Sequence, residues 1–136
     1  MSRTIELIIY GDPKAQKRHR STSRGGFTRQ YDPSASDKAD FLSVVQKNAP
    51  TTPFDSPLHL ELNFYFSRPK SHYNKKGLKQ DAPIWHTSKP DNDNLYKLVG
   101  DALNKVFWRD DSVIVSTSIT KRYDEKPRTE IKITQI

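Results

Sequence analysis

The segment Leu58–Phe66, with the sequence LHLELNFYF, alternates between apolar and polar residues along its whole length. Successive side chains of a β-strand point to opposite faces, so this pattern places every leucine and phenylalanine of the segment on one face. An apolar strand face has to be buried against another layer of the protein. The segment therefore predicts a strand at the core of the fold.

Five further elements are predicted from apolar periodicity and from stop signals. They are strands Thr4–Tyr10, Val113–Tyr123 and Thr129–Ile136, a helix from Ser34 or Ser36 to Asn48 with an apolar face of Ala39, Leu42, Val45 and Ala49, and a helix from Asp91 to Val106. The last two strands are predicted to form a hairpin around Glu125–Arg128. The element order predicts an α+β (mixed α/β) fold, with a single small sheet of about four strands and two helices packed on one face.

The composition excludes several classes of protein. The chain of 136 residues has no cysteine, which excludes disulfides, cysteine nucleophiles and cysteine-ligated metals. Its longest apolar run, near Leu7–Tyr10, is too short to span a membrane, and no signal peptide is visible. We therefore expect one cytoplasmic domain over residues 1–136, without a membrane partner.

The net charge of +7 is concentrated in two segments of the chain. Residues 13–31 and 68–89 together hold twelve basic residues and one acid, Asp81, which leaves the remainder with a net charge of −4. Basic segments of this kind attract a polyanion. The first segment contains Gly25 and Gly26 and is predicted to be a mobile loop.

Five aspartates lie within residues 89–111, KPDNDNLYKLVGDALNKVFWRDD, of this basic chain. The helix predicted there has an apolar stripe made of Leu95, Leu98, Val99, Ala102, Leu103 and Val106. Asp93, Lys97 and Asp101 are each four residues apart and form a column on the opposite side. Taken singly, the acids have simple structural interpretations: Asp91 as a helix N-cap, the column as an ion-pair ladder, and 110–111 as a turn.

Taken together, the aspartates fit a metal site. Asp91, Asp93 and one of Asp110 and Asp111 would converge if the strand after the helix ran back beside the start of the helix. Converging carboxylates repel one another unless a cation lies between them, and an all-oxygen site is typical of Mg²⁺ or Mn²⁺. Such a cation polarises a phosphoryl oxygen and activates water, and Lys97 could stabilise the developing charge. With the basic segments, this pattern predicts phosphodiester hydrolysis.

This stretch resembles the signature of the RusA family of Holliday-junction resolvases, which are metal-dependent endonucleases of bacteria and their prophages. The family pattern is Pro/Arg-Asp-x-Asp-Asn-Leu-x-Lys, followed by Asp-Ala-Leu and then by Trp-x-Asp-Asp. The chain supplies Pro90-Asp91-x-Asp93-Asn94-Leu95-x-Lys97, Asp101-Ala102-Leu103 and Trp108-x-Asp110-Asp111, in that order. Nearly every polar position of the pattern agrees, so the match over this stretch is a specific one.

The resemblance implies a RusA-like endonuclease domain that acts as a homodimer and resolves four-way DNA junctions by paired nicks in DNA recombination and repair. It implies Mg²⁺ as cofactor, with Mn²⁺ as a substitute, and no nucleotide cofactor. Asp91, Asp93 and Asp111 would be the catalytic metal ligands and Lys97 the essential cation, with Asp101 and Asp110 in supporting roles. The residues expected to bind DNA are Lys14, Lys17, Arg18, Arg20, Arg24, Arg29, Arg68, Lys70, Lys75 and Lys76.

Symmetry and composition also favour a homodimer. Two nicks related by a two-fold axis are most simply made by two copies of one site. Hydrophobic residues make up only 33% of the chain, and its aromatic residues are expected to exceed one small core; they include Phe41, Phe54, Phe64, Tyr65 and Phe66.

Two other functions remain open at this point. The chain could be a non-catalytic nucleic-acid-binding module with structural carboxylates, or a phosphohydrolase that acts on nucleotides and needs a concave base pocket. Nicking of branched DNA with and without EDTA discriminates between these functions.

Overall fold

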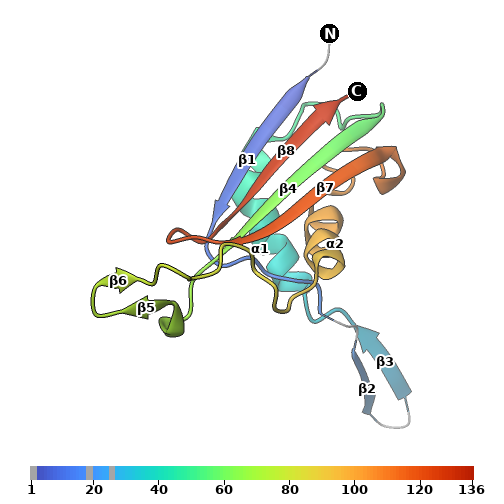
Figure 1. Cartoon of the computed structure of the whole chain (residues 1–136). Helices are drawn as coiled ribbons and strands as arrows, with labels where there is room; N and C mark the ends of the chain where they lie inside the picture. The colour runs from blue at the N-terminus through green and yellow to red at the C-terminus, as the bar shows by residue number, and fades with distance from the viewer. Residues whose placement is uncertain (1–2, 18–19, 25–26) are drawn as a thin grey trace.

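The structure is a computed structural model that describes residues 3–17, 20–24 and 27–136. Its centre is a four-stranded sheet in the order β1-β8-β4-β7 (Figure 1). The strands of this sheet are β1 (Thr4–Tyr10), β4 (Leu58–Phe66), β7 (Ile114–Tyr123) and β8 (Arg128–Gln135). The helices are α1 (Ala35–Val45), continued by a 3₁₀ turn over Gln46–Asn48, and α2 (Asn92–Leu103). The predicted mixed α+β class is confirmed.

The strand with the strict alternation lies inside the sheet, with β8 antiparallel on one side of β4 and β7 parallel on the other. The hairpin predicted between the last two strands is wrong, because β4 separates β7 from β8. Parallel neighbours need a crossover connection, and α2 supplies it between β4 and β7. The four residues 124–127 then carry the chain past the end of β4 into β8.

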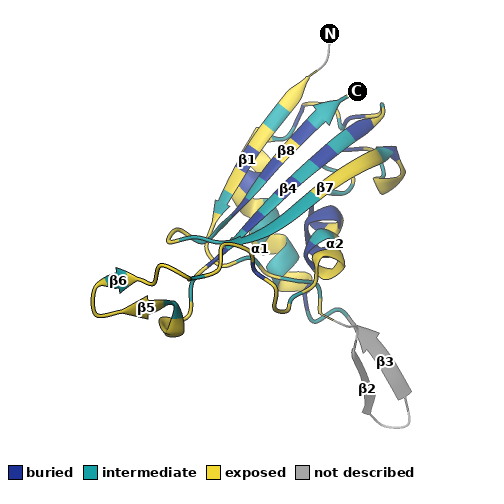
Figure 2. Cartoon of the chain, viewed as in Figure 1, coloured by how far each residue is buried: buried dark blue, intermediate teal, exposed yellow. Residues whose placement is uncertain are grey.

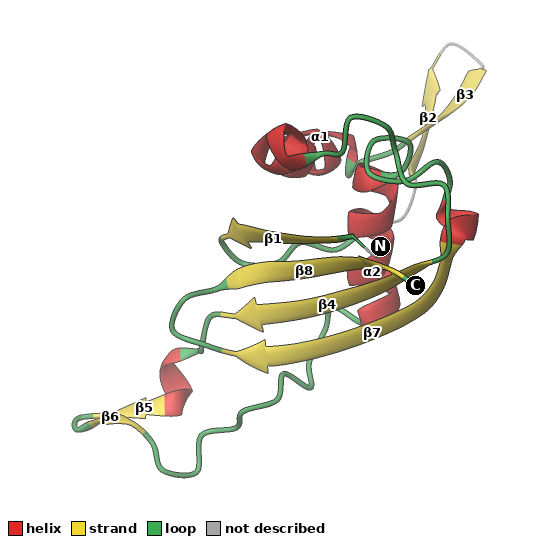
Figure 3. Ribbon diagram, turned by 90° about the horizontal axis from the view of Figure 1, so that it is seen from above, coloured by secondary structure: helices red, strands yellow, loops and turns green. Residues whose placement is uncertain are grey.

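Both helices cover the same face of the sheet, as Figure 3 shows. The alternate residues of β4 from Leu58 to Phe66 are buried against them, and α2 buries Leu95, Leu98, Val99, Ala102 and Leu103 (Figure 2). The apolar stripe predicted for α2 is therefore confirmed along the helix. In α1 the predicted face is only partly right, because Ala39 is exposed while Val45 is buried and Phe41 is half-buried.

The five aromatic residues expected to exceed one small core are buried or partly buried in the single chain. Phe54, Phe64 and Phe66 are 5%, 1% and 7% exposed in the single chain, and Phe107 and Trp108 are completely buried. Phe54 is joined to the turn after α2, because its N–H donates a hydrogen bond to the Phe107 carbonyl (2.9 Å). The expected aromatic surplus is thus no longer an argument for a second copy.

Two hairpins project from the body of the molecule in different directions (Figures 1 and 3). The longer pairs β2 (Arg20–Arg24) with β3 (Phe27–Tyr31), so the mobile loop predicted for residues 13–31 is wrong over these strands. The Gly25-Gly26 pair in the sequence is a two-residue turn signal that could have indicated this hairpin. The shorter hairpin pairs β5 (Tyr73–Asn74) with β6 (Gly77–Leu78), after a 3₁₀ turn over Lys70–His72.

Among the described residues, no helix is both long enough and apolar enough to cross a membrane.

Candidate active site

The N-terminal end of α2 carries two of the predicted catalytic carboxylates. Asp91 occupies the N-cap position, and Asp93 lies in the first turn; both are exposed. The side chain of Asp91 makes no capping hydrogen bond, so capping alone does not account for this aspartate. The positive end of the helix dipole reduces the repulsion between two carboxylates at this position. The carboxylates of Asp91 and Asp93 are therefore available to a ligand at the N-terminal end of α2.

Asp111 lies beyond the opposite end of α2. It opens a 3₁₀ turn over Asp111–Val113 just before β7, and its Oδ1 accepts a hydrogen bond from Nε1 of the buried Trp108 (2.8 Å). A helix of 12 residues is about 18 Å long, because each residue adds about 1.5 Å. Strand β7 does run back along α2, as predicted (Figure 1). Asp111 precedes this strand, so the strand does not bring Asp111 back to the start of α2.

The convergence predicted for Asp91, Asp93 and Asp111 is consequently not formed within one chain. Among the residues that the structure describes, no group of three histidine or acidic side chains is arranged so that it could hold a metal ion. Burial raises the pKa of the Tyr96 phenol, and the negative charge of Asp111 raises it further.

The ion-pair ladder, one of the simple structural interpretations of the Asp93, Lys97 and Asp101 column, is not formed as a whole, because Asp101 pairs with a lysine of another helix. Asp101 pairs with Lys38 of α1, whose Nζ lies 3.2 Å from Oδ2 of Asp101. The same Nζ lies 2.6 Å from Oδ2 of Asp32, at the base of the β2–β3 hairpin. Lys97 remains exposed, one turn along α2 from Asp93 and on the same face. Asp101 thus links α2 to α1 through this ion pair.

Lys38 and Asp32 are functional candidates that the sequence analysis missed. Hydrogen bonds from Lys38 and then from the Ser34 N–H lower the pKa of the Asp32 carboxyl. Burial of Lys38 acts against its charge, but the hydrogen bonds to the two aspartates outweigh burial and raise the pKa of Lys38. These residues are far apart in sequence and belong to no local motif, so only the fold brings them together.

This cluster clamps the β2–β3 hairpin onto the helix that carries the carboxylates. The segment that leads into β2 is fixed by Gln16. The Gln16 N–H donates to the Asn94 carbonyl (2.9 Å), and Gln16 Nε2 donates to Asp32 Oδ1 (3.1 Å). The segments before β2 and after β3 are joined by a hydrogen bond from the Lys17 N–H to Ser34 Oγ (2.8 Å). The clamp therefore sets the position of the basic hairpin relative to Asp91 and Asp93.

Replacing Lys38 by methionine should weaken this clamp while keeping the aliphatic part of the side chain. We expect the melting temperature to fall by roughly 3–5 °C, because two carboxylates lose a partly buried ammonium. Thermal unfolding followed by circular dichroism measures the change. The matched control is Lys47→Met, at an exposed position of the turn after α1, where a shift below about 1 °C is expected. An equal fall in both variants would contradict a specific role for Lys38.

Asp110, predicted as a supporting residue, organises the turn before β7. Its carboxylate accepts a hydrogen bond from the Ser112 N–H (3.1 Å) and pairs with Lys105 Nζ (3.0 Å). Bonds to Ser112 and then to Lys105 lower the pKa of the Asp110 carboxyl. The turn that follows positions Asp111.

The predicted DNA-binding residues fall on both hairpins and at their bases. Arg20, Arg24 and Arg29 lie in strands β2 and β3, while Arg18 lies outside the described residues. Lys17, Lys70, Lys75 and Lys76 are exposed. Arg68 differs from them, because its Nη1 donates to the Pro83 carbonyl (2.7 Å) and its guanidinium lies 5.6 Å from the centre of the Tyr123 ring. Arg68 therefore helps to fold the second basic segment.

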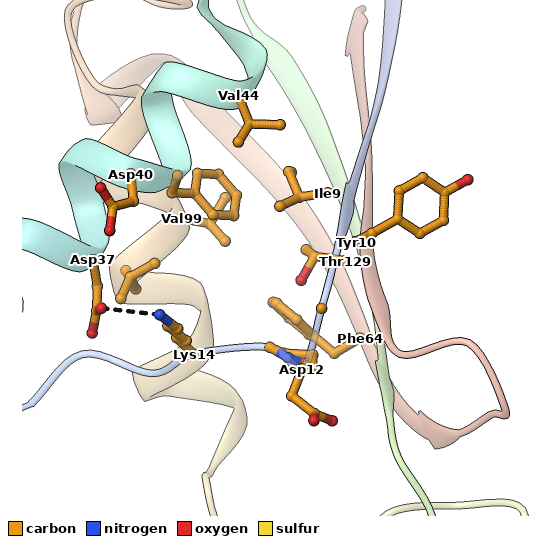
Figure 4. A pocket seen from close by; sticks show the side chains of 14 residues that line it. Ile9, Tyr10, Asp12, Lys14, Asp37, Asp40, Val44, Phe64, Val99 and Thr129 are labelled. Atoms are coloured by element: carbon orange, nitrogen blue, oxygen red, sulfur yellow. Dashed lines mark hydrogen bonds and ion pairs between the residues drawn. The ribbon is translucent and has the colours of Figure 1, made fainter.

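A hollow of about 400 Å³ lies between the end of β1 and the two helices (Figure 4). Lys14, another predicted DNA-binding residue, lines it and pairs with Asp37 of α1 across 3.3 Å. Most of the remaining lining is apolar, with Phe41, Phe64 and Val99 among its residues. The hollow includes neither Asp91 nor Asp93.

The donor set at the start of α2 suits a hard divalent cation. Asp91 and Asp93 offer carboxylate oxygens only, both are exposed, and Asp91 is not engaged in capping. Mg²⁺ in proteins is commonly held by one or two carboxylates and completes its shell with water and substrate phosphates. The residues present therefore fit this ion, with room for further ligands.

Comparison with known proteins identifies the family of this chain. The model of the family described as "Endodeoxyribonuclease RusA" matches residues 10–134, which include both hairpins, α2 and the turn before β7. The chain is 36% identical to the uncharacterized protein YqaN of Bacillus subtilis (strain 168), over 97% of this chain and 96% of that protein. It is 33% identical to a protein of Lactococcus phage r1t named crossover junction endodeoxyribonuclease rusA, over 78% of this chain and 77% of the phage protein. A family match over residues 10–134, together with a relative that is 33% identical over 78% of this chain, shows that the protein belongs to the RusA family of endodeoxyribonucleases.

Proposed function

We propose that this chain is a Mg²⁺-dependent, structure-selective DNA endonuclease that resolves four-way junctions by paired symmetric nicks, in DNA recombination and repair. The observation that carries the proposal is the exposed pair Asp91 and Asp93 at the N-terminal end of α2, next to the segment that leads into the basic β2–β3 hairpin, where the Gln16 N–H donates to the Asn94 carbonyl (2.9 Å). Membership of the RusA family and the name of the phage relative support the same activity.

The residues around the carboxylates have separate tasks in this proposal. A bound Mg²⁺ would supply Lewis-acid polarisation of the scissile phosphate. Asp91 and Asp93 would hold that ion, and Lys97, exposed on the same face of α2, would donate a hydrogen bond to an oxygen that gains charge. The exposed lysines of the hairpins would neutralise flanking phosphates, because carboxylates alone repel DNA. Lys38 would keep one hairpin at the correct distance from the cut.

The position of Asp111 makes a second copy of the chain part of the proposal. Asp111 lies beyond the far end of an α2 helix about 18 Å long from Asp91, so it is not a ligand to the same ion within one chain. In a two-fold dimer, Asp111 of one copy can complete the pair formed by Asp91 and Asp93 of the other, and two identical sites result. Such a dimer would have two cutting centres with the symmetry of a four-way junction.

The two alternative functions have less support from the structure. A phosphohydrolase acting on nucleotides needs a base pocket at its carboxylates, yet the 400 Å³ hollow is lined by other residues. A non-catalytic binding module gains nothing from the exposed Asp91 and Asp93, because they weaken its attraction for phosphate.

Nicking of a synthetic four-way junction is the direct test of the proposed function. In Mg²⁺ we expect nicks in two strands at symmetric positions, and with Mn²⁺ the same products. In excess EDTA we expect no nicking while the junction still binds in a gel-shift assay, since the basic hairpins remain. Ca²⁺ should allow binding with little cleavage, because it is a poorer Lewis acid and has a more flexible coordination geometry. Full cleavage in EDTA would exclude a metal mechanism, and binding without nicking in every metal would favour the binding module.

A further inference from the structure

Two large apolar side chains are exposed in the second basic segment. Ile84 is 62% exposed and Trp85 is 55% exposed. They lie within residues 68–89, where six basic residues accompany one acid. An exposed tryptophan in strongly basic surroundings matches the surface that single bases stack on, because the lysines and arginines hold the phosphate backbone nearby.

The backbone beneath these side chains is firmly attached to the sheet. The His86 N–H donates to the Lys121 carbonyl (3.0 Å), and the Tyr123 N–H donates to the Ile84 carbonyl (2.9 Å). These bonds pair Trp85 with Arg122 on the free edge of β7. The His86 ring is buried and stacks on Phe66, with 3.9 Å between the ring centres. Trp85 is therefore held by an extended segment that is anchored on both sides.

Arg122 stacks on the Trp85 ring. Its guanidinium carbon lies 5.0 Å from the centre of the Trp85 ring, so it covers one side of the indole while more than half of the side chain stays exposed. The Nε of Arg122 is buried and has no hydrogen-bond partner among the described residues. A cation stacked on tryptophan beside an exposed apolar surface suits a base together with its phosphate.

The same segment leads directly to the carboxylates. Nζ of Lys121 donates to the Ser88 and Pro90 carbonyls, both at 2.7 Å, and so fixes the chain between Trp85 and Asp91. Six residue steps span at most about 20 Å, since an extended residue covers about 3.3–3.6 Å. With one base pair per about 3.4 Å of duplex, Trp85 lies within about six base-pair steps of a phosphate cut at Asp91.

We infer that Trp85, supported by Arg122, stacks on a nucleobase whose face is exposed at the branch point of the DNA. In an intact duplex every base face is covered by its neighbours, so Trp85 would favour branched DNA over plain duplex. This inference rests on the proposed function and names the part of the chain that recognises the branch.

Binding measurements on variants test the inference. The full-length variants Trp85→Ala and Trp85→Phe are compared on a synthetic four-way junction and on a duplex of the same arm sequence, in EDTA to prevent hydrolysis. Trp85→Ala should weaken junction binding by about fivefold to a hundredfold and duplex binding by less than about twofold, while Trp85→Phe keeps most of the affinity. The matched control is Tyr10→Ala, which removes an aromatic side chain that is 72% exposed on β1 and should leave both affinities unchanged.

Fluorescence gives a direct readout on the unmodified chain. The protein has two tryptophans, and Trp108 is completely buried, so a quencher such as acrylamide reports on Trp85. Junction binding should quench Trp85 and protect it from acrylamide. In Trp85→Phe, which keeps Trp108 alone, the same DNA should cause no change.

Several results would overturn the inference. One is an unaltered Trp85 fluorescence signal in a junction-bound protein. Another is an equal loss of affinity for junction and duplex in Trp85→Ala. The third is a change of sedimentation mass in Trp85→Ala, which would show that Trp85 contacts a second copy of the chain. Nicking of the junction by the wild-type chain in Mg²⁺ is measured alongside. If the wild type nicks the junction and Trp85→Ala behaves identically, only the inference fails. If the wild type neither binds nor nicks the junction, both proposals fail.

Discussion

Replacing Asp91 or Asp93 by asparagine should reduce junction nicking by roughly a thousandfold or more, since a lost metal ligand removes several kcal/mol of transition-state stabilisation. Binding of the junction should be retained or become stronger, because each replacement removes a negative charge that repels phosphate. Asp111→Asn should have the same two effects. Nicking rates and gel-shift affinities on the same DNA separate chemistry from binding.

The matched control for these variants is Asp81→Asn. Asp81 is exposed and is the one acid in the basic segment 68–89, so this variant has the same change of charge outside the site. We expect it to nick at nearly the wild-type rate and to bind the junction at least as tightly. A nicking rate within tenfold of wild type in Asp91→Asn, Asp93→Asn or Asp111→Asn would remove that residue from the metal site.

Mixing two inactive variants should restore nicking if Asp111 acts in the partner's site. A dimer that combines one Asp91→Asn chain with one Asp111→Asn chain contains one complete site and one site that lacks both ligands. Co-expressed chains with different tags allow this mixed dimer to be purified. We expect it to nick at about half the wild-type rate, since one of the two symmetry-related sites is intact. Its nicks should be unpaired, so that junctions are nicked without being resolved.

The control for this experiment is a mixed dimer of Asp91→Asn with Asp93→Asn. Both changes affect the same end of α2, so each site of this dimer lacks one ligand whichever copy supplies Asp111. It should remain inactive. If the Asp91→Asn and Asp111→Asn mixture is equally inactive, the partner does not complete the site. Light scattering that shows a monomer of 15.7 kDa with paired nicking at low concentration would contradict the symmetric dimer itself.

Much of the sheet and the second helix could be predicted from the sequence because these elements are amphipathic. The alternation of Leu58–Phe66 and the stripe from Leu95 to Leu103 are local patterns, and burial of one face leaves little freedom of interpretation. The hairpin β2–β3 was missed because its strands are short and mostly polar, with no alternation to reveal them. The pairing of β7 with β4 was missed because short connections favour hairpins, whereas here the chain passes over the end of β4.

For the site, the sequence by itself determined which groups are the candidates for the chemistry. An Asp-x-Asp at a helix start, a lysine one turn later and an acidic pair after the helix are local features, and so is the excess of basic residues in two segments. Only the tertiary structure decided how these groups are distributed in space. It placed Asp111 at the opposite end of α2 from Asp91, joined Lys38 to Asp32 and Asp101, and set Trp85 on the edge of β7. Distances between residues far apart in sequence depend on the strand order and on the direction of each crossover, and no local pattern specifies either of them.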